Sequence, residues 1–180
     1  SVLGAPAARQ TVKAKAPKIY HRQGVGALLS YDTRFERNEE QATAARSVLN
    51  YALGYEWTPW ISMLEYATYK PSTSAVGSLR VTRQEETVLA WAYWQPRDFN
   101  LLTPYLGAGL GGIRNTVETS VGGFVDQDRS PWNMAAGAAL GLRLYPRKNF
   151  WLSTEGRMLK SSQLDPDPML GIMLRAGVVF

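Results

Sequence analysis

Hydrophobic and polar residues alternate along most of the chain between Gly24 and Phe180, with a period of two residues. The clearest stretch, residues 49–57, reads Leu-Asn-Tyr-Ala-Leu-Gly-Tyr-Glu-Trp, so every second side chain is large and apolar. Successive side chains of a β-strand point to opposite faces of its sheet. The pattern therefore predicts strands with one apolar face and one small or polar face.

Similar patterns predict about eight strands. We expect them at residues 24–35, 49–57, 60–69, up to about 95, 102–114, 133–144, 150–159 and 170–180. Proline and polar residues indicate short turns at 58–59, 95–100 and 145–149. Longer loops are expected near 36–44, 70–82, 115–131 and 160–168. The chain thus alternates short connections with long ones.

The second face of these strands favours a membrane barrel over a water-soluble one, whose apolar face would point inward. Several segments reach ten residues or more, which matches the about 9 to 11 residues that a tilted strand needs to cross a bilayer. The second face consists of Gly, Ala, Ser and Asn with a few charges in mid-strand, which in a narrow barrel would pair across the lumen. The predicted lumen charge network is Glu56, Glu65, Arg143, Glu155, Arg157 and Arg175.

Aromatic residues gather at the ends of the predicted strands, where amphipathic rings suit the two membrane interfaces. The predicted interface aromatics are Tyr55, Trp57, Trp60, Trp91, Tyr93, Trp132 and Trp151. The sequence therefore predicts an all-β fold, a closed antiparallel transmembrane β-barrel of about eight strands.

Composition excludes most catalytic chemistries. The chain is 45% hydrophobic but has no run of about 18 apolar residues, so a spanning helix is excluded. It has no cysteine and a single histidine, His21, so we expect no catalytic residue, metal site or cofactor. The formal charge of +5 is spread along the chain without a nucleic-acid-binding motif, so no nucleic-acid partner is expected.

The first 22 residues differ from the rest. They contain no acidic residue and carry the basic side chains Arg9, Lys13, Lys15, Lys18 and Arg22. We predict that residues 1–22 form a basic extended tail and that residues 23–180 form the barrel. An even number of strands puts both termini on the periplasmic side. There the tail is expected to contact a protein partner, peptidoglycan or anionic head groups through summed electrostatics.

Two segments carry a resemblance to a known class. The last strand, Leu-Gly-Ile-Met-Leu-Arg-Ala-Gly-Val-Val-Phe ending at Phe180, looks like the C-terminal signal that the barrel assembly machinery reads. Residues 103–112, Thr-Pro-Tyr-Leu-Gly-Ala-Gly-Leu-Gly-Gly, look like a barrel strand of the same class. The chain resembles small bacterial outer-membrane β-barrels, similar to the transmembrane domain of outer membrane protein A and its relatives. The resemblance implies a Gram-negative outer membrane, contact with its lipids and lipopolysaccharide, and Phe180 as the assembly signal.

Three classes of function remain open. A structural or interaction subunit of the cell envelope, acting through tail, turns or outer loops, is preferred because the residues provide no catalytic group. A small channel or a conduit for small or hydrophobic compounds is the alternative, with the lumen charges as its lining. A lipid-modifying barrel enzyme ranks last, because His21 lies in the tail, on the wrong side for chemistry in the outer leaflet.

Overall fold

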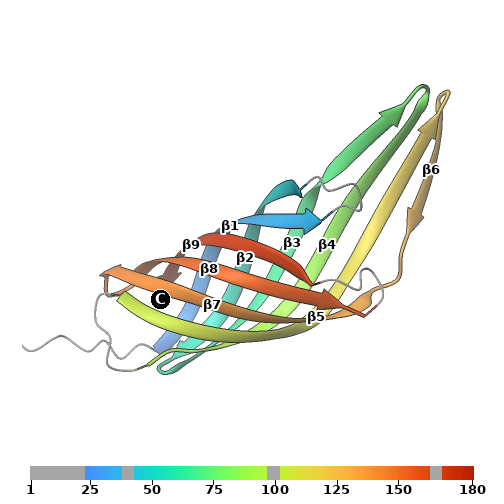
Figure 1. Ribbon diagram of the computed structural model, residues 1–180. Helices are drawn as coiled ribbons and strands as arrows, with labels where there is room; N and C mark the ends of the chain where they lie inside the picture. Colours follow the sequence, from blue (N-terminus) through green and yellow to red (C-terminus); the bar gives the residue numbers. More distant parts are fainter. Residues whose placement is uncertain (1–22, 38–42, 97–101, 163–167) are drawn as a thin grey trace, which may run out of the picture.

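The computed structural model describes residues 23–37, 43–96, 102–162 and 168–180 (Figure 1). These segments contain no helix long and apolar enough to cross a membrane. Their strands are β1 (Gln23–Arg37), β2 (Thr43–Trp57), β3 (Trp60–Val76), β4 (Leu79–Trp94), β5 (Leu102–Val121), β6 (Phe124–Arg129), β7 (Asn133–Arg147), β8 (Phe150–Ser161) and β9 (Met169–Val179).

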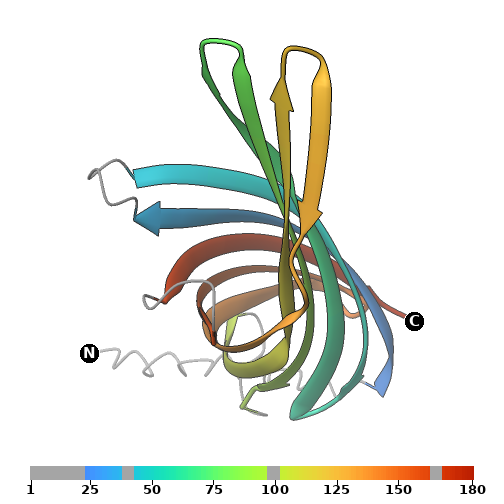
Figure 2. The ribbon, with the colours of Figure 1, turned by 90° about the vertical axis from the view of Figure 1, so that its right-hand side faces the viewer.

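Eight of these strands close into an antiparallel barrel (Figures 1 and 2). The hydrogen-bonded order is β4-β3-β2-β1-β9-β8-β7-β5, and the ring closes because β4 also pairs with β5, down to Trp94↔Leu106. The first and last barrel strands meet along a register that runs from Gly26↔Val179 to Phe35↔Leu170. Closure leaves no open sheet edge at this level. The predicted all-β closed barrel of eight strands is confirmed.

The outer surface of the barrel is a belt of exposed apolar side chains. It includes Leu53, Leu64, Leu110, Leu140, Ile172 and Leu174, each more than half exposed. Trp57, Trp60 and Trp94 form a row of cross-strand neighbours at the turn end of the belt, and Tyr31, Tyr51 and Tyr66 face outward nearer its other end. An apolar belt between aromatic rings suits the hydrocarbon core of a bilayer and its two interfaces.

The inner surface combines large aromatic rings with glycine. Trp91 and Tyr93 on β4 are buried in the lumen, directly across from Gly109 and Gly107 on β5. A Cβ atom on Gly109 would lie 2.6 Å from the Trp91 ring, so only glycine leaves the ring its space. A narrow barrel is filled by its own side chains, and here small residues on one strand accommodate large residues on the next.

The strands extend beyond the barrel on one side as a projecting sheet (Figures 1 and 2). Pairing continues from Ser72↔Arg83 to Val76↔Leu79, from Arg83↔Val117 to Leu79↔Val121, and from Thr116↔Arg129 to Val121↔Phe124. We call this four-stranded sheet, residues 72–83 and 116–129, the arm. Its two hairpin turns contain Gly77, Gly122 and Gly123, all with positive φ.

The arm corrects part of the loop prediction. Residues 70–82 and 115–131 were expected to be loops, but most of them are strands. The turn at 58–59 is where the sequence placed it, and β7 and β8 are joined by a short turn after Arg147. The connections at 38–42, 97–101 and 163–167 lie outside the described residues.

Candidate functional site

Four ionised side chains meet in the middle of the lumen. Glu65 comes from β3, Glu155 and Arg157 from β8, and Arg175 from β9. Because side chains alternate along each strand, all four share the inward face of their strands, and none is more than 5% exposed. We call these four residues the central ion cluster. It contains two carboxylates and two guanidiniums and is neutral as a whole.

Arg157 joins the two sides of the barrel. Its Nη1 and Nη2 donate to Oε1 and Oε2 of Glu65 at 2.5 and 2.7 Å, a two-pronged pair. Its Nε donates to Glu155 on the same strand. Since β3 and β8 are not neighbours in the sheet, the Arg157–Glu65 pair crosses the lumen.

Arg175 completes the alternation of charge. Its Nη1 donates to Glu155 Oε2 and its Nη2 to Glu65 Oε2, both at 2.8 Å. Each carboxylate therefore contacts both guanidiniums. Charge-assisted bonds of this kind compensate for the loss of water, which a single buried ion could not do.

Two tyrosines extend the central ion cluster. The Tyr93 hydroxyl on β4 accepts from Arg157 and from Arg175, each at 2.9 Å. The Tyr105 hydroxyl on β5 donates to Glu155 Oε2 at 2.8 Å. With them the network reaches five strands around the lumen. This cross-section of the barrel is occupied by mutually bonded side chains.

A second, looser polar group lies towards the turn end of the lumen. Arg143 on β7 is fully buried, and its Nη1 is 4.0 Å from Glu56 Oε1 on β2 and 3.5 Å from Gln95 Oε1. Its guanidinium carbon lies 4.0 Å from the centre of the Trp151 ring, so a cation–π contact replaces part of the missing hydrogen bonding. The Nε and Nη2 atoms of Arg143 have no hydrogen-bond partner among the described residues.

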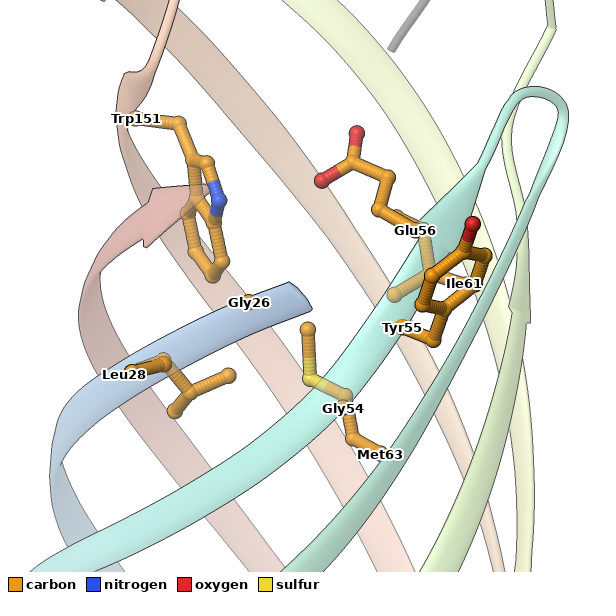
Figure 3. A pocket seen from close by; sticks show the side chains of 9 residues that line it. Gly26, Leu28, Gly54, Tyr55, Glu56, Ile61, Met63 and Trp151 are labelled. Atoms are coloured by element: carbon orange, nitrogen blue, oxygen red, sulfur yellow. The ribbon is translucent and has the colours of Figure 1, made fainter. Parts of the chain in front are cut away.

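A small pocket lies beside this second group (Figure 3). Figure 3 shows Leu28, Ile61, Met63 and the Trp151 ring around it, with the Glu56 carboxylate above. The enclosed space of about 10 Å³ is the size of a single water molecule. It is too small to hold a substrate or a cofactor. The described residues also contain no group of three His, Asp or Glu side chains that could hold a metal ion.

The base of the arm is fastened to the barrel rim. Arg114 on β5 forms an ion pair with Glu86, its direct neighbour on β4, and its guanidinium lies 4.6 Å from the centre of the Trp132 ring. Ser130 and Asn115 exchange two hydrogen bonds of 2.9 Å. These contacts join β4, β5 and the segment between β6 and β7 where the arm meets the barrel.

The six charges predicted for the lumen are all buried inside the barrel, in the two groups described above. Sequence reasoning missed Tyr105, Gln95 and Tyr145 as their partners. Tyr105 has a sequence signal, because it shares its alternation phase with Gly107 and Gly109 and must therefore face inward with them.

The prediction of interface aromatics is right for some residues and wrong for others. Tyr55, Trp57, Trp60 and Trp132 face outward and are between 39% and 46% exposed. Trp91, Tyr93 and Trp151 are instead buried in the lumen at 2% or less. The physical reason is the glycine opposite each ring, since a Cβ on Gly109, Gly107 or Gly177 would collide with Trp91, Tyr93 or Trp151.

Two predicted elements remain to be tested. The tail with Arg9, Lys13, Lys15, Lys18 and Arg22 lies outside the described residues. The backbone N–H of Phe180 donates to the Val25 carbonyl at 2.9 Å, and its ring is 79% exposed on the outer face. Its role as an assembly signal stays a prediction.

No protein-family model matches the chain, and no curated protein does. Among solved structures it is similar to Neisserial surface protein A, with a TM-score of 0.67 and 19% identity over 88% of this chain and 97% of that one. It is also similar to Ail, the attachment invasion locus protein of Yersinia pestis, solved in complex with the heparin analogue sucrose octasulfate. That TM-score is 0.63, with 17% identity over 88% of this chain and 100% of Ail. These likenesses show that the fold is that of the small outer-membrane barrels.

Proposed function

We propose that this chain is a closed outer-membrane barrel that neither conducts nor catalyses, and that it acts by holding the arm outside the bilayer as an interaction surface. The observation that carries this proposal is the central ion cluster. It fills the lumen at mid-height with bonded side chains, whereas a channel needs a continuous polar path.

The same proposal fixes the orientation of the molecule. With an even number of barrel strands, the chain begins and ends on the same side, which for this class is the periplasmic side. The arm leaves the opposite rim of the barrel. The arm then stands on the cell surface, and the basic tail stays in the periplasm, where its partner remains a prediction.

An enzymatic role has little support in the geometry. Glu65 and Glu155 are each bonded to two guanidiniums, so neither is available as a general acid or base to a bound substrate. The pocket of Figure 3 holds no more than a water molecule. The arm is therefore the interaction surface in this proposal.

Conductance across a planar lipid bilayer tests the proposal. We expect the purified full-length chain to insert without discrete current steps at low or high salt, because the central ion cluster stays paired. Insertion should be verified independently by the slower gel mobility that a barrel shows after heating. Reproducible current steps in wild-type protein would overturn the sealed barrel and favour the channel alternative.

A further inference from the structure

The far end of the arm carries a row of four exposed apolar side chains. Val76, Leu79, Val121 and Phe124 are direct cross-strand neighbours in that order on β3, β4, β5 and β6. Cross-strand neighbours project from the same face of a sheet. Their exposed fractions run from 38% for Leu79 to 86% for Phe124. We call these four residues the tip row.

The two turns beside the tip row and the next cross-strand row contain no acidic residue. The two turns beside it are Gly77-Ser78 and Gly122-Gly123. The next row back, on the other face, contains Ala75, Arg80, Ser120 and Val125, and Val125 is 63% exposed. The first acidic residue, Asp126, follows one row later. One face of the tip is therefore apolar, the other face is mixed, and the nearest charge along the arm is the cation Arg80.

We propose that the tip row inserts into the surface of a lipid bilayer that faces the one spanned by the barrel. This inference rests on the proposed function, which holds the arm out as an interaction surface. Exposed apolar patches on a soluble surface indicate a binding site for an apolar partner. Apolar and aromatic side chains at the end of a structure can enter the boundary between head groups and acyl chains, while flanking cations attract anionic head groups.

The shape of the tip favours a lipid surface over a protein partner. The tip row lies at the convex end of two hairpins that stand side by side (Figure 2). A fluid bilayer can receive a convex apolar end without a matching pocket. Arg80, exposed one row behind the tip row, would then lie at the depth of the lipid phosphates.

A single fluorescent label can report the insertion, because the chain has no cysteine of its own. The full-length barrel carrying Ser78→Cys would be labelled with an environment-sensitive dye and placed in phosphatidylcholine nanodiscs. Liposomes of phosphatidylcholine, alone or mixed with phosphatidylglycerol, would then be added. We expect a blue shift and a brighter emission with both, with the stronger response for the anionic mixture.

Two further variants make the experiment decisive. The same label at Gln127→Cys, lower on β6, should not respond, since that position stays in water. Leu79→Ser with Phe124→Ser should abolish the response of the label at position 78. The proposal would be overturned by silence at position 78 with both liposomes, which would favour a protein-facing tip. An equal response at position 127, or a response that survives the double serine variant, would also overturn it. None of these outcomes bears on conductance, so the sealed barrel is judged separately.

Discussion

At the scale of single residues, the buried charges of the lumen fall into two groups, one closely paired and one loosely paired. In the central ion cluster every carboxylate contacts two guanidiniums, and the hydrogen bonds that Glu65 accepts measure 2.5 to 2.8 Å. Arg143, in contrast, approaches Glu56 only to 4.0 Å. Removing one partner from a buried ionic network leaves the others uncompensated, which costs far more than removing a surface charge. The two groups should therefore respond differently to substitution.

We predict that Arg157→Met lowers the free energy of unfolding by about 3 kcal/mol. The variant keeps an unbranched apolar stem but leaves Glu65 without its two-pronged partner, and both glutamates remain buried. Arg143→Met should cost less, because the replaced guanidinium makes fewer and longer contacts with carboxylates. Guanidinium-chloride titration of tryptophan fluorescence, with the barrel folded into lipid vesicles, would measure both changes.

Arg129→Met is the matched control for these two variants. Arg129 is exposed on the arm, so its replacement should leave the unfolding midpoint unchanged. A loss as large for Arg129→Met as for Arg157→Met would show that the effect does not come from the lumen. If Arg157→Met and Arg143→Met lowered the free energy of unfolding equally, the proposed difference between the closely and the loosely paired charges would be wrong.

At the scale of strands, alternation predicted the positions of the barrel strands well. It was less reliable in predicting which face of each strand points into the lumen. Mid-strand charges identify the inward face of β8 and β9, because a charge facing lipid would be costly. β4 has no charge between Val88 and Trp94, so nothing within this strand spoke against the prediction that Trp91 and Tyr93 lie at the membrane interface. The direction of these rings is decided by Gly107 and Gly109 on the neighbouring strand, which leave space for them in the lumen. The pattern of β4 alone does not contain this information.

Most of the arm escaped prediction for a different reason. Both of its faces meet water, so residues 116–121 and 124–129 need not alternate between apolar and polar side chains. Alternation with a period of two residues arises when one face of a sheet is apolar and the other is polar. In a sheet that is solvated on both sides, the two faces differ little in polarity, so the alternation is weak. Glycines and polar residues such as those at 115–123 then read as a loop, although backbone pairing with β4 and β6 makes them strand.

We predict that the barrel folds without the arm. Residues 74–81 and 117–128 would each be replaced by Asn-Gly, a two-residue hairpin turn, which retains the pairs Thr73↔Thr82 and Thr116↔Arg129. Val117 and Glu118 pair with Arg83 and Thr82, which remain at the base of the arm, and the other removed residues pair only with one another. The barrel itself therefore loses none of its ladder contacts. Circular dichroism and heat-dependent gel mobility should match wild type. Failure to fold would show that the arm helps to form the barrel.

At the scale of the whole molecule, one chain presents apolar residues to two different surroundings. Leu110 on the barrel and Val125 on the arm are almost equally exposed, at 65% and 63%. Their neighbours differ: Leu110 is flanked by Ala90 and Ala136 within the apolar belt, whereas Val125 shares its row with Ser120 and Arg80. Exposure alone therefore does not separate residues that face lipid from residues that face water.

A charge at each of these positions would separate them. We predict that Leu110→Arg destabilises the folded barrel in lipid vesicles by about 2 to 4 kcal/mol, the cost of a cation near the bilayer midplane. Val125→Arg should leave the free energy of unfolding nearly unchanged, because its guanidinium stays hydrated in the unfolded and the folded chain. Denaturant titration in vesicles of one lipid measures both. Equal destabilisation would mean that the bilayer extends up the arm, and no effect of Leu110→Arg would mean that the belt does not face lipid. A difference of the predicted sign would place the membrane boundary between the two residues.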